Sequence, residues 1–101
     1  MAPPPLLTED EIAEALSRLS DWNRDGDHLR AEFRFSDFAA AMAFMVQVGY
    51  EAERRNHHPE WSNVYNRVTV GLTTHDSGGL SHHDVDLATV MSSLAGDAGS
   101  R

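Results

Sequence analysis

Leu29-Arg30-Ala31-Glu32-Phe33-Arg34-Phe35 is the stretch of sequence from which the fold can be worked out. Its apolar and charged residues alternate, which is the period of a β-strand with one buried face. Asp25-Gly26 comes shortly before it and predicts a tight hairpin turn, because glycine adopts positive φ at little cost. Trp22 therefore begins a partner strand, and the two strands are expected to pair antiparallel.

Helices are expected on both sides of this hairpin. Thr8-Glu9-Asp10-Glu11 has the pattern of a capping box and predicts a helix from about Glu9 to Leu19. Ser36-Asp37 predicts the cap of a longer second helix, and Pro59 ends that helix because the residue before a proline is pushed out of the α region. The buried stripe of the second helix is expected to consist of Phe38, Met42, Met45, Gly49 and Ala52.

A second hairpin and a last helix complete the chain. Ser62–Tyr65 and Arg67–Thr73 are the expected strands, with alternating inward residues in the latter. Ser81 is expected to cap a helix that ends near Leu94. The order α-β-β-α-β-β-α predicts an α+β fold in which three helices pack on one face of a four-stranded antiparallel sheet.

Length and composition set the class of protein. The 101 residues suit one domain, expected at 8–95, between a flexible Pro-rich leader without function at 1–7 and a flexible tail at 96–101. The net charge of -8 argues against nucleic acid and against an anionic membrane surface as partners. The chain has no cysteine, which excludes disulfides and thiolate chemistry, and it has no apolar run of membrane-spanning length. A cytoplasmic protein is expected.

Three histidines are the candidate catalytic residues. His57 and His58 follow the second helix, His75 follows the second hairpin, and the three rings are expected to share one cleft. Imidazole titrates near neutral pH, so it can accept and return a proton within one turnover. Glu53 lies one helical turn before His57 and can orient an imidazole. The remaining histidines, His28, His82 and His83, are expected to be exposed and without chemistry.

Other kinds of site fit the sequence less well. The same three histidines could bind zinc, but two of them are adjacent and the chain has no HExxH helix. Ser77-Gly78-Gly79 lacks the glycine that precedes the serine of a nucleophile elbow, and two glycines are too few for a phosphate-binding loop.

The combined motif resembles that of a known family. Glu53-x-x-x-His57-His58-Pro59, followed by Tyr65, His75 and Asp84, resembles the signature of the pterin-4a-carbinolamine dehydratases. The similarity covers about residues 8 to 94. Further stretches that are similar to this family are Asp21-Trp22-Asn23, Phe33-Arg34-Phe35-Ser36-Asp37-Phe38, the run from His57 to Asn66, Thr73-Thr74-His75 and Gly79-Leu80-Ser81.

The resemblance implies a reaction and its setting. The expected activity is dehydration of 4a-hydroxytetrahydrobiopterin, the carbinolamine left by an aromatic amino acid hydroxylase, to quinonoid dihydropterin in tetrahydrobiopterin recycling. No metal or organic cofactor is expected. The resemblance also implies a homodimer or homotetramer. Animal members bind a homeodomain transcription factor as well, but the small apolar side chains of Ala39-Ala40-Ala41 give no reason to assign that role to this chain.

The resemblance also implies residue roles. His58 would be the main acid/base, with His57 and His75 assisting, while Glu53 and Asp84 would orient the histidines. Two departures stand out: Asn56 replaces an acidic residue frequent among relatives, and Ser77 replaces the cysteine of animal members. A non-catalytic binding module with the same fold is the alternative, and retention of all three histidines favours the enzyme. The implied substrate-binding residues are Pro59, Trp61, Thr74, Asp76 and Ser77.

Overall fold

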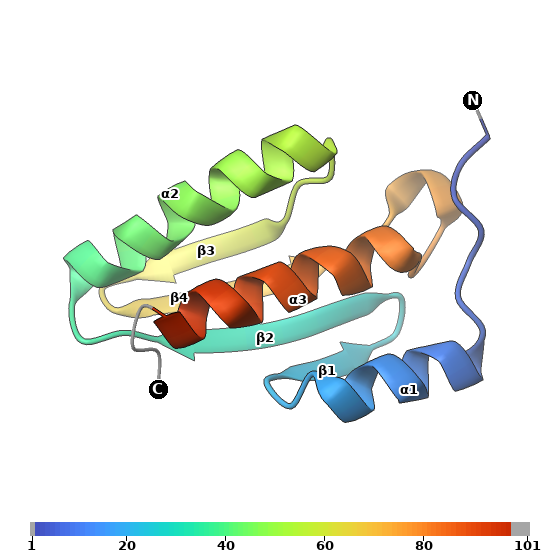
Figure 1. The fold of residues 1–101 in the computed structure, drawn as a ribbon, viewed down its shortest axis with the longest axis horizontal. Helices are drawn as coiled ribbons and strands as arrows, with labels where there is room; N and C mark the ends of the chain where they lie inside the picture. The colour runs from blue at the N-terminus through green and yellow to red at the C-terminus, as the bar shows by residue number, and fades with distance from the viewer. Residues whose placement is uncertain (1, 98–101) are drawn as a thin grey trace.

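The structure is a computed structural model that describes residues 2–97. It confirms the expected α+β fold and the order of its elements (Figure 1). In chain order the elements are α1 (Glu9–Arg18), β1 (Trp22–Asp25), β2 (His28–Arg34), α2 (Phe38–Arg55), β3 (Glu60–Val64), β4 (Arg67–Leu72), the short 3₁₀ helix η1 (His75–Ser77) and α3 (His82–Asp97).

The four strands form one antiparallel sheet in the order β1-β2-β4-β3. Gly26 has a φ of 61° in the turn between β1 and β2, which is the positive φ expected there. β2 and β4 lie at the centre, with Leu29 opposite Leu72 and Phe33 opposite Val68. β1 and β3 are therefore the two edges, and the start of β2 lies beside the end of β4.

The helices cover the apolar face of this sheet. Figure 1 shows α2 and α3 side by side over the strands and α1 along the β1 edge. The ring of Phe44 on α2 lies 5.4 Å from that of Phe33 and 5.0 Å from that of Phe35. Trp22 donates its indole N–H to the Ser92 hydroxyl at 2.8 Å, which joins β1 to α3.

None of the helices within residues 2–97 is long and apolar enough to cross a membrane.

The buried stripe of α2 differs from the expected one. It consists of Ala41, Phe44, Val48 and Ala52. Phe38 and Met42 are exposed, so of the predicted stripe only Ala52 is buried. The helix is apolar on two sides, and periodicity alone cannot tell which side faces the sheet. The second apolar side remains on the surface.

The two ends of the domain also differ in detail from the prediction. α3 runs to Asp97, three residues past the expected Leu94, because Gly96 is accommodated within the helix. The residues before α1 lie against the loop between β4 and α3, where the Leu7 amide donates to the Leu80 carbonyl at 2.9 Å. Of the expected flexible ends, Met1 and residues 98–101 lie outside the described residues.

Candidate active site

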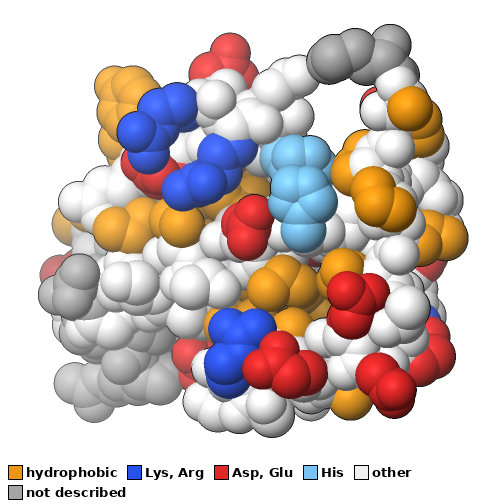
Figure 2. Space-filling view, turned by 45° about the vertical axis from the view of Figure 1, so that its right-hand side comes forward, with side chains coloured by type: hydrophobic (Ala, Val, Ile, Leu, Met, Phe, Trp, Pro, Cys, Tyr) orange, Lys and Arg blue, Asp and Glu red, His pale blue; other side chains and the backbone are white. Residues whose placement is uncertain are grey.

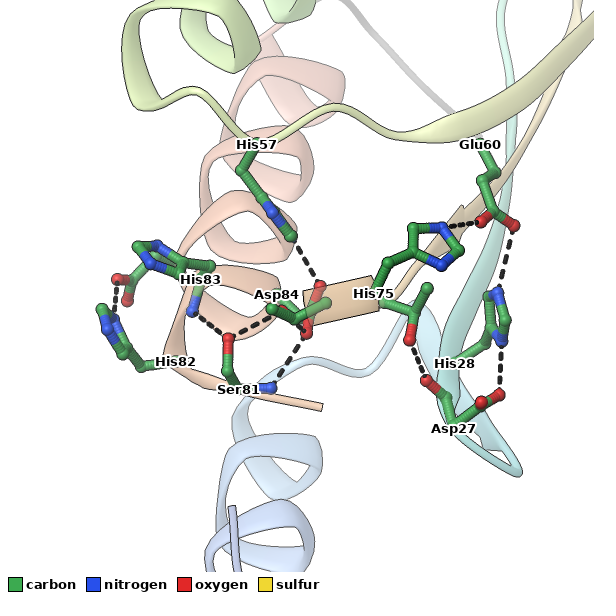
Figure 3. A network of polar contacts seen from close by, with 12 residues as sticks. Asp27, His28, His57, Glu60, His75, Ser81, His82, His83 and Asp84 are labelled. Carbon is green, nitrogen blue, oxygen red and sulfur yellow. Dashed lines mark hydrogen bonds and ion pairs between the residues drawn. The ribbon is translucent and has the colours of Figure 1, made fainter. Parts of the chain in front are cut away.

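Asp84 is the centre of a buried polar network in the first turn of α3. Its carboxylate is fully buried, and one oxygen, Oδ1, lies 2.7 Å from Nε2 of His57. The other, Oδ2, accepts from the Thr74 hydroxyl at 2.7 Å and from the Ser81 amide at 2.9 Å. Figure 3 shows His57 reaching down from the α2–β3 connection to meet this carboxylate. The α2–β3 connection, the segment after β4 and the start of α3 are thus joined at one buried carboxylate.

The network fixes where its protons lie. A carboxylate accepts only, so Nε2 of His57 carries a proton, and in the neutral ring Nδ1 is left as a base. Because the single hydrogen of Thr74 goes to Asp84, the Ser81 hydroxyl must donate to Thr74, at 2.7 Å. Every buried side-chain polar atom among residues 2–97 has a partner. The arrangement holds His57 in one tautomer and one orientation.

His57 reaches this position because α2 ends in a sharp turn. Asn56 adopts the left-handed conformation, with a φ of 52°, and the His57 amide donates back to the Ala52 carbonyl at 3.0 Å. Asparagine tolerates this region better than most residues other than glycine. The turn directs the chain away from the helix axis and toward α3.

A cavity of about 550 Å³ borders this network. Only one of the three predicted catalytic histidines, His57, lines it. On the face shown in Figure 2, histidine side chains gather at the centre, with basic side chains to one side and apolar ones to the other. The residues that line the cavity are Ala2, Pro3, Pro4, Arg55, Asn56, His57, Thr74, Asp76 and His83.

His58 and His75 do not line this cavity, although both lie next to residues that do. Nε2 of His58 bonds to Oε1 of Glu53 at 2.8 Å, and Nε2 of His75 bonds to Oε2 of Glu60 at 2.8 Å. The side chains of His58 and His75 are 57% and 77% exposed, against 12% for His57. A single cleft shared by all three rings, as the sequence suggested, is therefore not formed. Local carboxylates hold two of the rings on the surface.

The His75 contact belongs to a second polar cluster on the uncovered face of the sheet. Glu60 also accepts from Nε2 of His28 at 3.0 Å, and Nδ1 of His28 lies 2.8 Å from Asp27 (Figure 3). Two carboxylates against both ring nitrogens require a doubly protonated imidazole if both bonds are made. The cluster spans β2 to β3 across Gly71 of β4, where a Cβ would lie 3.5 Å from the His28 ring.

The charges of these groups follow from their contacts. Burial by itself lowers the pKa of His28, but hydrogen bonds to Asp27 and Glu60 outweigh it and raise that pKa. The hydrogen bond to His28, together with that to His75, lowers the pKa of Glu60, and the bond to His28 lowers the pKa of Asp27. The pKa of His83 is lowered, first by burial and then by the charges of the nearby His82 and His57. The second cluster therefore favours a charged His28, and the cavity favours a neutral His83.

The other predicted site residues lie in several places. Thr74 and Asp76, two of the predicted substrate-binding residues, line the cavity. Trp61 and Pro59 do not, and Trp61 is half-buried against the hydrophobic core, where an alternating strand places its inward side chains. The hydroxyl of Ser77 donates to the Pro4 carbonyl at 2.5 Å. Glu53 and Asp84 each contact a histidine.

The sequence missed three residues of this region. His83 was expected on the surface, yet it is half-buried, lines the cavity and has its ring 5.5 Å from that of His57. His28 was expected to be a solvent-facing turn residue, whereas it is half-buried and begins β2. Glu60 lies in the run from His57 to Asn66 that resembles the family, but no role was predicted for it. The alternation of β2 and β3 places His28 and Glu60 on the same uncovered face, but only the register shows that they meet.

No group of three or more His, Cys, Asp and Glu side chains within residues 2–97 is arranged to hold a metal ion. The rings of the rival zinc site are each turned toward a carboxylate of their own. What the geometry offers is acid/base chemistry by imidazoles held by carboxylates. The fold and this site together define a small α+β protein with a buried histidine–carboxylate pair at the wall of a largely polar cavity.

Comparison with known proteins narrows this class. The sequence profile of the family described as pterin 4 alpha carbinolamine dehydratase matches residues 5–94. A protein of Rhizorhabdus wittichii is 54% identical over 91 residues, which cover 88% of this chain and 94% of that protein. One of Opitutus terrae is 50% identical over 86 residues, covering 84% and 89%. Both are named provisionally as pterin-4-alpha-carbinolamine dehydratases. The chain belongs to the pterin-4a-carbinolamine dehydratase family.

One solved structure agrees with this assignment, and a second shares the fold. The crystal structure of a transcriptional coactivator/pterin dehydratase from Brucella melitensis is 41% identical, with a TM-score of 0.87, and the match covers 89% of this chain and 98% of that one. A pterin dehydratase-like protein identified as a RuBisCO assembly factor in the α-carboxysome is 21% identical, with a TM-score of 0.62 over 74% of this chain and 87% of that one. The second likeness shows a shared fold alone.

Proposed function

We propose that this protein dehydrates a pterin-4a-carbinolamine, with 4a-hydroxytetrahydrobiopterin as the substrate and quinonoid dihydropterin as the product. One observation carries the proposal: a chain of this family places an imidazole, fixed by a buried carboxylate, at the wall of a cavity large enough for a bicyclic ring. His57, His58 and His75 are the proposed acid/base residues.

The chemistry needs only proton transfers. A general acid protonates the departing 4a hydroxyl, the C4a–O bond breaks, a general base takes the N5 proton, and the C4a=N5 double bond forms as water leaves. No change of oxidation state occurs overall, so the reaction requires no oxidant or reductant. Two groups of different protonation are required, which imidazoles in different surroundings can supply.

The positions of His58 and His75 would allow their rings to turn into the cavity when a pterin binds. His75 lies between Thr74 and Asp76, which both line the cavity, and His58 follows His57. Their carboxylate contacts are exposed, and exposed pairs of this kind are worth about 0–1 kcal/mol. Catalytic hydrogen bonds are often completed only when substrate binds. A pterin that bonds to these rings can therefore replace Glu53 and Glu60 at small cost.

The test is carbinolamine loss followed by ultraviolet absorbance. We expect wild-type protein to exceed the uncatalysed rate and His57→Ala, His58→Ala and His75→Ala each to lower kcat/KM by about 10²- to 10⁴-fold. His82→Ala is the matched control, because His82 is exposed and does not line the cavity. A wild-type rate equal to the background would refute the enzyme and leave a binding module of the same fold. Stoichiometric zinc in the purified protein would instead favour a metal protein.

We also propose self-association, which the exposed side of α2 supports. Phe38, Met42, Val46 and Tyr50 recur at every fourth residue and are 48%, 40%, 53% and 75% exposed. A continuous apolar stripe of this kind usually marks a protein interface. A second copy of the chain, in a homodimer or homotetramer, is the proposed occupant.

The cellular setting that we propose follows from the family. The enzyme would act in the cytoplasm on the carbinolamine released by an aromatic amino acid hydroxylase and return the pterin to recycling. Family membership supports this setting. The test is whether deletion of the gene lowers hydroxylase turnover in cells that depend on recycled pterin.

A further inference from the structure

Three residues ahead of α1 form one wall of the cavity. Ala2, Pro3 and Pro4, which we call the N-terminal strap, line it together with six residues from the rest of the domain. All six others are polar: Arg55, Asn56, His57, Thr74, Asp76 and His83. The strap is therefore the apolar wall of an otherwise polar cavity.

The segment before α1 is attached to the rest of the domain at two points, of which one lies in the strap itself. The Leu7 amide donates to the Leu80 carbonyl at 2.9 Å, and the Ser77 hydroxyl donates to the Pro4 carbonyl at 2.5 Å. Proline fixes φ and has no N–H to satisfy, so Pro3-Pro4-Pro5 loses little conformational entropy when it is held in place. One side-chain hydrogen bond at Pro4 is then enough to position the residues before it. Ser77 is the donor of that bond.

The chemistry of a pterin matches this division of the walls. The edges of its fused rings carry hydrogen-bond donors and acceptors, which suit polar side chains, whereas the substituent at C6 of biopterin is a three-carbon chain that bears two hydroxyls and ends in a methyl group. Because apolar surface gains most from apolar contact, the strap is the wall that suits the carbon atoms and the methyl group of this substituent. The strap precedes residues 5–94, the part of the chain that matches the family model.

We infer that the N-terminal strap determines which C6 substituent the site accepts, and that Ser77 is the residue that positions it. The inference rests on the proposed pterin site. It changes the predicted part of Ser77, whose hydroxyl would act on the strap and not on the ligand.

The experiment measures two dissociation constants by quenching of intrinsic fluorescence. The ligands are 7,8-dihydrobiopterin and 7,8-dihydropterin, which lacks the C6 substituent. In wild-type protein we expect the substituted ligand to bind more tightly. In a variant lacking Ala2, Pro3 and Pro4 the ratio of the two constants should fall by about fourfold for each methylene-sized group that loses contact. Ser77→Ala should lower the ratio in the same direction, and Ser77→Thr, which keeps the hydroxyl, should retain it.

Two further results separate the outcomes. Combining the deletion with Ser77→Ala should lower the ratio no further than the deletion alone, because the hydroxyl acts through the strap. Equal midpoints of urea unfolding show that the variants keep the fold. If wild-type protein binds and turns over pterin but the deletion leaves the ratio unchanged, or if the two changes add, the inference is wrong and the proposed function stands. If wild-type protein binds neither ligand, both fail.

Discussion

Replacing Asp84 by Asn should reverse the tautomer of His57 while leaving the fold in place. Asn has nearly the same shape as Asp, and its carbonyl can take the position of Oδ2, where it keeps the bonds from Thr74 and the Ser81 amide. The amide NH₂ then faces Nε2 of His57, which must become an acceptor. The ring proton moves to Nδ1, which is then no longer a base.

The cost of changing Asp84 can be estimated from its contacts. Asp84→Asn keeps two of the three hydrogen bonds, reverses the third and loses the charge, which should lower the free energy of unfolding by about 1–3 kcal/mol. Asp84→Ala leaves three donors without their acceptor in a buried site and should cost about 3–5 kcal/mol. A domain of this kind has about 5–15 kcal/mol in total. The Asn variant should therefore fold, and the Ala variant should be marginal.

Two measurements test this reasoning. Long-range ¹H–¹⁵N correlation spectra distinguish the two tautomers of His57, and urea unfolding gives the change in stability. For Asp84→Asn we expect the Nδ1–H form and a fall in kcat/KM of about 10²- to 10⁴-fold. Asp86→Asn is the matched control, since Asp86 is exposed on the same helix and contacts His82. Two results would refute the assignment of Asp84 as the centre of the polar network: an unchanged His57 tautomer in the Asn variant, or a loss of less than about 1 kcal/mol in the free energy of unfolding of the Ala variant.

The remaining predictions concern stability and assembly. The folded-state pKa of His28 is raised and that of Glu60 is lowered, so their contact should stabilise the fold fully between pH 4.5, the unfolded pKa of Glu60, and pH 6.5, the unfolded pKa of His28. This stabilisation should be lost as pH rises through the folded-state pKa of His28 or falls through that of Glu60. Urea unfolding of wild type and His28→Ala across pH tests whether the difference in their free energies of unfolding narrows outside this window. His83 has a lowered pKa, so its effect has the opposite sign: wild-type stability relative to His83→Gln should fall as pH drops from 6.5 through the folded-state pKa, and a pH-independent difference would contradict this. Met42→Glu places a charge in the exposed stripe of α2 and should reduce the assembled mass in light scattering, which Glu51→Gln on the same helix should not do. Tyr65 has a φ of 51°, and Tyr65→Asn should raise the free energy of unfolding by about 0.5–1 kcal/mol; no gain in urea unfolding would mean that its backbone is not strained.

The fold was predictable because local patterns and the overall topology agree. The alternation in β2 and β4, the turn at Gly26 and the capping box at Thr8 each have one structural solution. The face of α2 was not predictable, since Phe38 and Met42 form as good an apolar stripe as Ala41 and Phe44. That choice depends on the rings of β2 that α2 must cover.

The candidate site was predictable in part, for a related reason. Its residue types and the contact between Glu53 and the His57-His58 segment depend on short spacings, which a sequence displays. His83 and Glu60 enter through register and helix phase, which bring together residues far apart in the chain. Exposure cannot be judged from residue type either, because His82 and His83 are neighbours and only one lines the cavity.

The carboxylate pairs of the three proposed catalytic histidines differ mainly in how deeply they are buried, and that difference predicts how the proposed site works. His57 is 12% exposed against a fully buried Asp84, whereas His58 and His75 are 57% and 77% exposed against surface carboxylates. A buried pair is costly to break and an exposed one is not. His57 can therefore serve as the fixed reference of the site, while the other two rings adapt to the ligand. In a dihydropterin complex, His57 should keep its bond to Asp84, and His58 and His75 should leave Glu53 and Glu60. A complex in which the exposed rings stay in place would mean that His57 and its network carry the chemistry without them.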